Sequence, residues 1–192
     1  MLAYLYVLLH GVTLERIKEF FFSLVLLFLN HVVTHIPCWY LRKPFYLLAG
    51  MRIGKGSRIL MNTIVQGPRS IVIGSHSYIN GHCLLDGRGG LTIGDNVNVS
   101  NFSKLISGSH DMKSPTFDFR GGEVLIEDYC WIGTGAMVLD NSRLRRCSVL
   151  GAGSVFKGVS EQSTVYVGVP ARAVKKRCFE PHGDLIWRPF FV

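Results

Sequence analysis

An apolar residue recurs at every sixth position along four blocks of this chain. A six-residue period fits neither the 3.6-residue repeat of a helix nor the two-residue alternation of a half-buried strand, so it indicates a repeat architecture. Three blocks are three hexads long, and the last is twice that length. The recurring residues are Ile53, Ile59, Val65, then Ile73, Ile79, Leu85, then Ile93, Val99, Leu105, then Ile126, Ile132, Val138, Leu144, Leu150 and Phe156.

Small residues accompany this period and mark tight corners. The residue two places before the next apolar position is usually small, as at Ser57, Ser77 and Ala136, and glycine often follows the apolar position directly. Three short strands per turn, each ending at a corner, predict a triangular parallel β-helix whose apolar columns fill the interior. An antiparallel sandwich is the alternative, but it predicts polar–apolar alternation and irregular turn spacing. The extra residues between Leu105 and Ile126 belong to a surface excursion from one corner.

The repeat, followed by Gly168-Val-Pro-Ala-Arg172, resembles the left-handed β-helix hexapeptide acyltransferases. Within that family it is most similar to galactoside and maltose O-acetyltransferases and to the O-acetyltransferases of bacterial exopolysaccharide, capsule and lipopolysaccharide. The resemblance covers roughly residues 50 to 177 and implies a left-handed β-helix of about five coils. It also implies acetyl-CoA as a donor substrate, no permanently bound cofactor, and a homotrimer with active sites between adjacent subunits.

The candidate catalytic residue is His110, at the root of the excursion in the segment Ser107-Gly-Ser-His-Asp. An imidazole can take the proton of an attacking hydroxyl near physiological pH, and such general-base catalysis typically contributes about 100- to 10,000-fold. An ordinary exposed loop histidine is the alternative. In the resembling acetyltransferases the base is a histidine in this Gly-x-His-like setting, and His110 matches it. Asp111 either orients His110 or simply caps the loop.

Four polar residues one coil earlier are candidates for binding the acceptor: Asn80, His82, Asp86 and Arg88. Asn80 matches an acceptor-side asparagine of the galactoside acetyltransferases, whereas Arg88 replaces an acidic residue expected there, which leaves the sugar undefined. An ordinary corner insertion is the alternative for this segment. His76 and His82 lack a carboxylate or cysteine set with ligand spacing, so no metal site is predicted.

Six residues are candidates for binding coenzyme A through the resemblance, although coil packing is the alternative for each. Positions beside the pantetheine arm are matched by Trp131, Thr134, Ala152 and Lys157, and the cationic positions after the Gly-x-Pro turn by Arg172 and Lys175. Lys157 departs from a more usual threonine. Trp131 follows a corner residue and is expected to point outward, where a ligand or a neighbouring subunit would cover it.

Residues 1–50 form a separate N-terminal hydrophobic region, in which two apolar stretches flank the charged residues 15–19. Helices are expected there, and neither stretch alone reaches the roughly 20 residues that span a bilayer. Three interpretations stay open: an in-plane membrane-binding helical pair, a collar packed on the coil or on sister subunits, and one tilted span with a charged break. Arg42, Lys43 and Arg52 would face anionic headgroups or cap a helix end.

The remaining assignments concern the domain bounds, the charge and the cysteines. Residues 51–161 form the catalytic β-helix with loop 107–124, and residues 162–192 form a C-terminal cap and tail, whose Trp187, Phe190 and Phe191 either dock on apolar surface or contact a membrane. The net charge is +8, but no aromatic-interleaved basic platform accompanies it, so no nucleic acid partner is predicted. Five cysteines without ligand spacing indicate core residues in a reducing compartment.

The sequence therefore predicts a mainly β, cytoplasmic O-acetyltransferase that moves acetyl from acetyl-CoA to a sugar hydroxyl, on a bacterial surface polysaccharide or its lipid-linked precursor. The enzyme would sit on the inner face of the cytoplasmic membrane through peripheral contact. Two alternatives stay open. One is an N-acyltransferase of a nucleotide-linked amino sugar, and the other is a non-catalytic β-helix scaffold.

Overall fold

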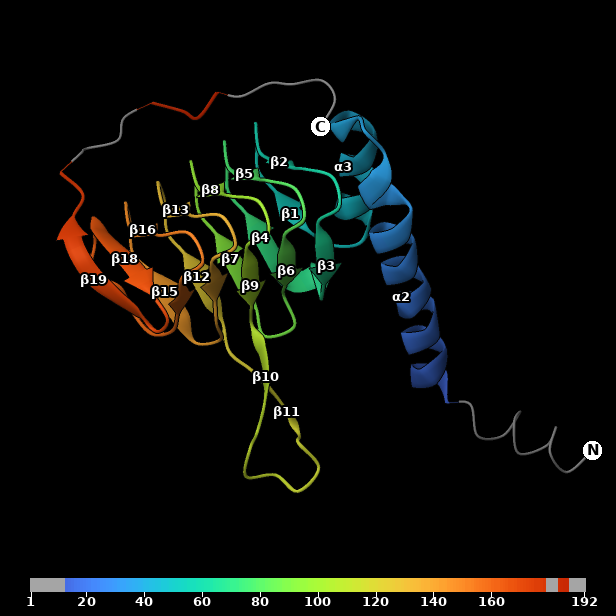
Figure 1. Cartoon of the computed structure of the whole chain (residues 1–192). Coiled ribbons are helices and arrows are strands. Elements are labelled where there is room, and N and C mark those ends of the chain that lie inside the picture. The colour runs from blue at the N-terminus through green and yellow to red at the C-terminus, as the bar shows by residue number, and fades with distance from the viewer. Residues whose placement is uncertain (1–12, 179–182, 187–192) are drawn as a thin grey trace, which may run out of the picture.

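A computed structural model describes residues 13–178 and 183–186, and within them the chain forms a parallel β-helix with three flat faces (Figure 1). Five coils are complete, and β18 begins a sixth. Face 1 contains β1 (Arg52–Ile53), β4 (Ile71–Ile73), β7 (Leu91–Ile93), β12 (Val124–Ile126) and β15 (Ser142–Leu144). Face 3 contains β3 (Ile64–Gln66), β6 (Leu84–Asp86), β9 (Lys104–Ile106), β14 (Met137–Val138) and β17 (Val155–Phe156).

Face 2 is the longest sheet and reaches beyond the last full coil. It contains β2 (Arg58–Ile59), β5 (Tyr78–Ile79), β8 (Asn98–Val99), β13 (Trp131–Ile132), β16 (Val149–Leu150), β18 (Thr164–Gly168) and β19 (Ala171–Lys176). All of its pairings are parallel except that of β18 with β19, which is antiparallel. The chain thus reverses direction at its last strand.

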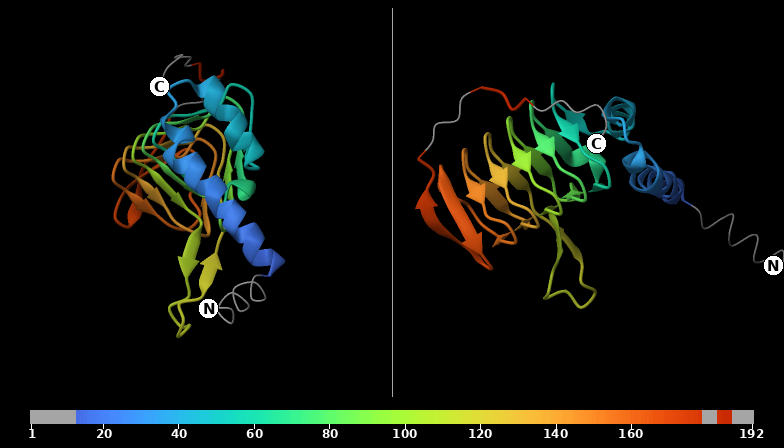
Figure 2. Two further views of the ribbon diagram at one scale, coloured as in Figure 1. Left: turned by 90° about the vertical axis from the view of Figure 1, so that its right-hand side faces the viewer. Right: turned by 45° about the horizontal axis from the view of Figure 1, so that its top comes forward.

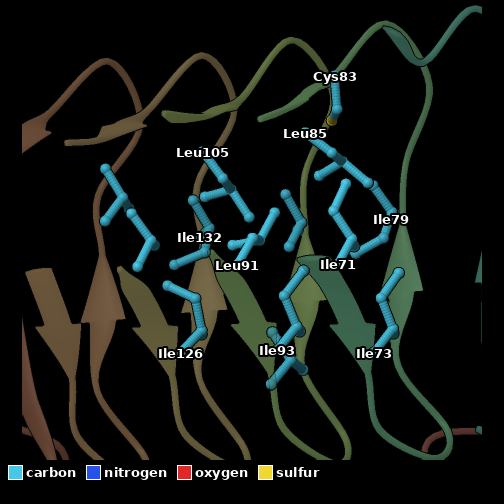
Figure 3. Close-up of a cluster of buried hydrophobic side chains, with 14 of the residues drawn as sticks. Ile71, Ile73, Ile79, Cys83, Leu85, Leu91, Ile93, Leu105, Ile126 and Ile132 are labelled. Carbon is cyan, nitrogen blue, oxygen red and sulfur yellow. The ribbon is translucent and has the colours of Figure 1, made fainter. Parts of the chain in front are cut away.

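The six-residue period and the strand register agree residue by residue. Ile53 pairs with Ile73, and Ile73 with Ile93, on face 1, while Leu85 pairs with Leu105 on face 3. The columns fill the interior, where Ile93 and Leu105 are almost completely buried (Figure 3). Continuous burial of such columns is the main stabilising contribution to the coil.

Left-handed backbone conformations shape the corner between faces 2 and 3. Asn62, His82 and Phe102 occupy this corner in successive coils, with φ angles of 61°, 59° and 63°. In the next two coils the position is taken by Gly135 and Gly153, with φ angles of 68° and 66°. Residues other than glycine rarely adopt a positive φ angle. The first three coils nevertheless carry large side chains at this corner, whereas the next two coils carry none.

Two helices cover the N-terminal end of the β-helix. α2 (Leu14–His31) and α3 (Trp39–Leu48) are joined through a short 3₁₀ turn, η1 (Val33–His35), and η2 (Pro68–Ser70) lies at a corner of the first coil. Leu29, Val33 and Tyr46 are buried and belong to the same core cluster as the coil residues. This part of the N-terminal region therefore packs on the first coil, in the position that the collar interpretation describes.

The charged residues 15–19 do not interrupt the helix, because α2 runs through them from an N-cap at Thr13. Residues Leu14–His35 form one segment of 22 residues that is long and apolar enough to cross a membrane by length and composition, and 17% of its most apolar window is buried. The N-terminal half of α2 leads away from the solenoid (Figure 2).

Arg42 is buried, so of the two roles predicted for it the lipid-facing one is wrong. Its side chain is completely buried, and its guanidinium donates to the carbonyl oxygens of Ile36 and Ile59. Burial lowers the pKa of Arg42. The residue joins the helical cap to the first coil because backbone carbonyls inside the cap need donors.

Asn30 fastens α2 to the first coil through both polar atoms of its amide. Its Nδ2 donates to the Val65 carbonyl at 2.9 Å, and its Oδ1 accepts from the Val65 amide at 2.9 Å. Replacing Asn30 with leucine is expected to cost about 1–3 kcal/mol, since part-buried backbone groups of Val65 lose their partners. Urea denaturation measures this loss, and an equally stable variant would show that α2 is held by apolar contacts alone.

The C-terminal region both closes the coil and returns along its side. Tyr166 packs edge-on against Phe156, with ring centroids 5.2 Å apart, and ends the apolar interior. Residues 183–186 lie on the outer surface of face 2, where Tyr78 donates to the Leu185 carbonyl and the Leu185 amide donates to Asn96. The described tail therefore lies along the side of the solenoid. The predicted docking residues Trp187, Phe190 and Phe191, and the apolar stretch 1–12, lie outside the described residues.

Candidate active site

The excursion between the third and fourth coils is an antiparallel hairpin, a regular element in place of the predicted loop. It contains β10 (Gly108–His110) and β11 (Phe119–Gly121), and it projects from the corner between faces 3 and 1 (Figure 1). His110 is the last residue of β10 and pairs with Phe119. Its ring is exposed and meets Phe119 edge-on, with ring centroids 6.3 Å apart. The candidate base is thus held on a strand.

A backbone carbonyl fixes which ring nitrogen of His110 carries the proton. Nδ1 lies 2.6 Å from the Phe117 carbonyl oxygen. A carbonyl oxygen can only accept, so this hydrogen bond requires a proton on Nδ1. In the neutral ring, Nε2 then has a free lone pair and can act as an acceptor. This is the tautomer that a base removing a hydroxyl proton requires.

The hairpin tip keeps the Phe117 carbonyl in place through a small polar network. Asp118 accepts hydrogen bonds from Thr116 at 2.7 Å and from Ser114 at 2.8 Å, and these two hydroxyls lower the pKa of Asp118. Asp111 accepts from the Lys113 amide at 2.9 Å and so caps the turn. Of the two roles considered for Asp111, this contact supports the capping role.

The root of the hairpin rests on Asp86, at the end of β6 in the coil below. Asp86 is completely buried; its Oδ2 accepts from the Gly108 amide at 3.0 Å, and its backbone carbonyl accepts from the Ser107 hydroxyl. Arg88 donates from Nε to Oδ1 and from Nη2 to Oδ2 of the same carboxylate, both at 2.9 Å. The Arg88 guanidinium also lies 5.3 Å from the Phe119 ring centroid. We call Asp86 and Arg88 the brace.

The brace is electrostatically satisfied without any ligand. Burial disfavours the Asp86 carboxylate, but hydrogen bonds from the side chain and backbone of Arg88 and from the Gly108 amide outweigh it and lower the pKa of Asp86. Hydrogen bonding to Asp86 raises the pKa of Arg88. Gly108 has no room for a side chain here, because an added Cβ would lie 2.8 Å from Arg88 Nη2 and 2.9 Å from Asp86 Oδ2. Asp86 therefore cannot line an open cleft, and this part of the acceptor prediction is corrected.

The other two acceptor candidates lie at a different corner of the same coil. Asn80 donates from Nδ2 to Asn98 Oδ1 at 3.0 Å and to the Val99 carbonyl at 2.8 Å. His82 is exposed and stacks on Phe102, with ring centroids 5.0 Å apart. Asn80 and His82 precede strand β6, whereas Asp86 is its last residue and Arg88 follows it. One chain therefore does not bring the four acceptor candidates into one cleft.

Five of the six coenzyme A candidates lie on face 2 or at its corner with face 3. Trp131 is 48% exposed and points outward, with its indole donating to the Ser100 hydroxyl. Thr134 and Ala152 are exposed at the same corner of consecutive coils, where the Gly153 amide donates to the Thr134 carbonyl at 2.9 Å. Arg172 and Lys175 are exposed on β19, at the end of face 2.

Lys157 is held by a buried carboxylate on the fourth coil. Its Nζ lies 2.7 Å from Oδ1 of Asp140, a residue that is 4% exposed, and the ion pair lowers the pKa of Asp140 against the opposing effect of burial. Arg120 of the hairpin approaches the same carboxylate at 3.8 Å. Sequence reasoning missed this link between the hairpin and the next coils, because residues 120, 140 and 157 share no short motif.

Two of the cysteines occupy interior corner positions and are poor nucleophiles. Burial raises the pKa of Cys83 to about 11 and that of Cys130 to about 12. A thiol is reactive only as the thiolate, so neither side chain is suited to covalent catalysis. Over residues 13–178 and 183–186, no group of three His, Cys, Asp or Glu side chains that could hold a metal ion is found.

The sequence is similar to that of a bacterial protein named as an acetyltransferase. No protein-family model matches the chain. WcaF of Escherichia coli K12, named as an acetyltransferase of colanic acid biosynthesis, is 30% identical over 131 residues, which cover 68% of this chain and 71% of WcaF. The chain belongs to the hexapeptide-repeat acetyltransferases. The predicted family and enzyme class are thereby confirmed.

A second relative and a solved structure are also similar to this hexapeptide-repeat acetyltransferase. The dTDP-4-amino-4,6-dideoxy-D-glucose acyltransferase of Escherichia coli is 29% identical over 147 residues, covering 71% of this chain and 77% of that protein. A hexapeptide-repeat acetyltransferase of Vibrio cholerae, solved with bound acetyl-CoA, superposes with a TM-score of 0.74 at 23% identity, covering 86% of this chain and 91% of the other. The second likeness confirms the mainly β solenoid.

Proposed function

We propose that this protein transfers acetyl from acetyl-CoA to a sugar hydroxyl, with His110 as the general base. The observation that carries the proposal is the hydrogen bond from Nδ1 to the Phe117 carbonyl, since it leaves Nε2 able to accept a proton on an exposed ring. The neighbours solved with acetyl-CoA or coenzyme A support the donor. The relative named for colanic acid biosynthesis supports a bacterial surface polysaccharide, or its lipid-linked precursor, as the acceptor.

The reaction needs one proton transfer in each direction and no enzyme nucleophile. The acceptor oxygen attacks the thioester carbonyl carbon while Nε2 of His110 takes the hydroxyl proton. The tetrahedral intermediate then collapses, the carbon–sulfur bond breaks, and the thiolate of coenzyme A leaves. The imidazolium returns its proton to that sulfur, which yields an acetyl ester and free coenzyme A.

A homotrimer would complete the site. In one chain, His110 and Lys157 lie at the corner between faces 3 and 1, whereas Asn80, His82 and the other coenzyme A candidates lie on or beside face 2. A flat sheet face offers no enclosed pocket for a thioester. A neighbouring subunit would bring its own face 2 against the hairpin, so that Trp131, Thr134, Ala152, Arg172 and Lys175 bind the donor while Asn80 and His82 meet the sugar.

We place the enzyme on the cytoplasmic side of the membrane, where acetyl-CoA is made.

N-acylation of a nucleotide-linked amino sugar is the second candidate, and the acyltransferase of dTDP-4-amino-4,6-dideoxy-D-glucose favours it. An amine attacks a thioester without needing its proton removed first if it is already neutral, so dependence on the base would be weaker.

Acceptor competition distinguishes the two functions. The purified chain is supplied with acetyl-CoA and paired acceptors that differ only in bearing a hydroxyl or an amino group, and release of free thiol is followed. Thiol release with a neutral sugar or glycan, accompanied by an acetyl ester in the product, is the expected result. Exclusive turnover of amino acceptors would replace the proposal with N-acylation, and no turnover of acetyl-CoA with either class would favour a scaffold.

A further inference from the structure

Helix α2 carries an exposed apolar surface, from Ile17 to Phe28, that the solenoid does not cover. Ile17, Phe20, Phe21, Val25, Leu27 and Phe28 are each between 41 and 60% exposed. At about 100° per residue they spread over roughly 160° of the helix circumference. A monomeric protein rarely leaves a contiguous apolar surface of this kind in water, so a binding partner is expected. We call these six residues the apolar face.

Charge on α2 is arranged around the apolar face. On the same helical projection, Arg16 and Lys18 fall at its two edges, and Glu15 and Glu19 fall on the opposite side. Lys18 is 2.9 Å from Glu15, but both side chains are largely exposed, so the pair is weak in water. Long cationic side chains at the edges of an apolar face reach phosphate groups while their stems stay in the apolar layer.

The surface continues from α2 onto the end of α3 as a shallow groove. The groove has a volume of about 320 Å³ and is lined by Phe21, Val25 and Leu48 together with the cations Lys18 and Arg69. Leu48 is 84% exposed, and the Arg69 guanidinium lies 5.1 Å from the Phe22 ring centroid. An apolar floor with cations at its rim is suited to a phospholipid, whose acyl chains lie below a phosphate headgroup.

These observations decide between an anionic bilayer and a second copy of the chain. Each copy has a net charge of +8, and Arg16 and Lys18 lie at the edges of the apolar face while Glu15 and Glu19 lie on the opposite side of the helix, so two such faces would bring like charges together. Anionic phospholipid supplies both the apolar layer and the negative charge. Net attraction therefore favours lipid.

The helix is suited to lying in the interface, not to crossing it. The four charged residues among positions 15–19 occupy the first turns of α2, and the remainder of the apolar segment, from Phe20 to His35, is shorter than the roughly 20 residues that cross a bilayer. The other half of α2 is fixed to the first coil by buried Leu29 and by the Asn30 hydrogen bonds. Both views of the molecule show the hairpin β10–β11 projecting from the solenoid on the side toward which the N-terminal half of α2 extends (Figures 1 and 2).

We propose that the apolar face of α2, with Arg16, Lys18 and Arg69, binds the surface of an anionic phospholipid bilayer in the plane of the membrane. The inference deepens the membrane-side location proposed above and does not depend on the proposed chemistry. It directs the hairpin that carries His110 toward the same surface, where a lipid-linked acceptor would be held.

Vesicle flotation with the full chain tests the proposal. Vesicles of phosphatidylcholine mixed with phosphatidylglycerol should bind the protein, and phosphatidylcholine alone should bind it much more weakly. Arg16→Gln with Lys18→Gln should weaken partition to the mixed vesicles by about 30-fold, at the usual contribution of each cation near an anionic surface. Phe20→Ser with Phe21→Ser should weaken it by more than about tenfold on both vesicle types.

A matched control removes apolar residues of similar exposure from the solenoid. Val159 and Val174 are 61 and 55% exposed, and Val159→Ser with Val174→Ser should leave partition unchanged. Circular dichroism verifies that each variant is folded, and partition of His110→Ala should match the parent, which separates this test from the enzymatic one. Equal partition of the Phe20/Phe21 variant and the parent would overturn the proposal. So would a changed oligomeric mass in that variant without loss of lipid binding, or resistance of bound protein to alkaline carbonate, which indicates a span.

Discussion

Replacing His110 with alanine is expected to lower kcat by about 100- to 10,000-fold, the usual contribution of a positioned general base. The ring is exposed, and its Nδ1 bonds only a loop carbonyl in the described contacts, so stability should change by less than about 0.5 kcal/mol. KM for acetyl-CoA should stay near that of the parent, because most of the candidate donor residues lie on or beside face 2. Steady-state thiol release, with thermal melting of both proteins, measures these effects.

His35→Ala is the matched control for this prediction. His35 is also exposed, but it lies in η1 within the N-terminal cap and away from the hairpin. It should retain parental turnover. If His110→Ala kept more than about a tenth of the parental kcat while melting at the same temperature, His110 would be an ordinary loop residue and the base would have to be sought elsewhere.

The repeat could be predicted from sequence because it depends on a single strong pattern. Columns such as Ile53–Ile73–Ile93 must face inward in every coil, and a six-residue period allows only one register for them. The hairpin could not be predicted in the same way. Its strands alternate polar and small residues, as in Gly108-Ser-His110, and they are held by side chains of another coil. The burial of Arg42 could not be predicted either, because its partners are backbone carbonyls, which every residue carries and no sequence motif marks.

The candidate site, like the fold, could be predicted only in part from the sequence. His110 was identified from its setting beside glycine at the base of the excursion, and the structure adds the carbonyl that selects its tautomer. Asp86 and Arg88 are polar residues one coil before that histidine, but the sequence alone cannot distinguish a role in binding the acceptor from a role in supporting the hairpin. That distinction depends on the completeness of their mutual hydrogen bonding, which only coordinates show.

Asp86→Asn should reduce kcat by about tenfold to 100-fold without removing any group from the hairpin itself. The carboxylate receives hydrogen bonds from Arg88 and from the Gly108 amide, and the asparagine NH₂ would turn a donor toward one of these donors. The root of the hairpin would shift, and small displacements of a catalytic group have effects of this size. Lost charged hydrogen bonds at a buried group should cost about 1.5–3 kcal/mol of stability. Turnover and urea denaturation at neutral pH measure the two effects.

The pH dependence of that stability difference tests the charge of Asp86 directly. Its pKa is lowered in the folded protein, so the contribution of the carboxylate is present above the unfolded pKa of about 4 and is lost as the pH falls through the lower folded value. The parent should therefore lose its stability advantage over Asp86→Asn in acid.

Glu127 provides the control, since its carboxylate accepts hydrogen bonds from the Arg143 side chain and from the Arg146 amide at another corner. These contacts lower the pKa of Glu127 against the opposing effect of burial. Glu127→Gln should lower stability but keep parental kcat. A parental kcat in Asp86→Asn would instead show that the hairpin holds His110 without the brace.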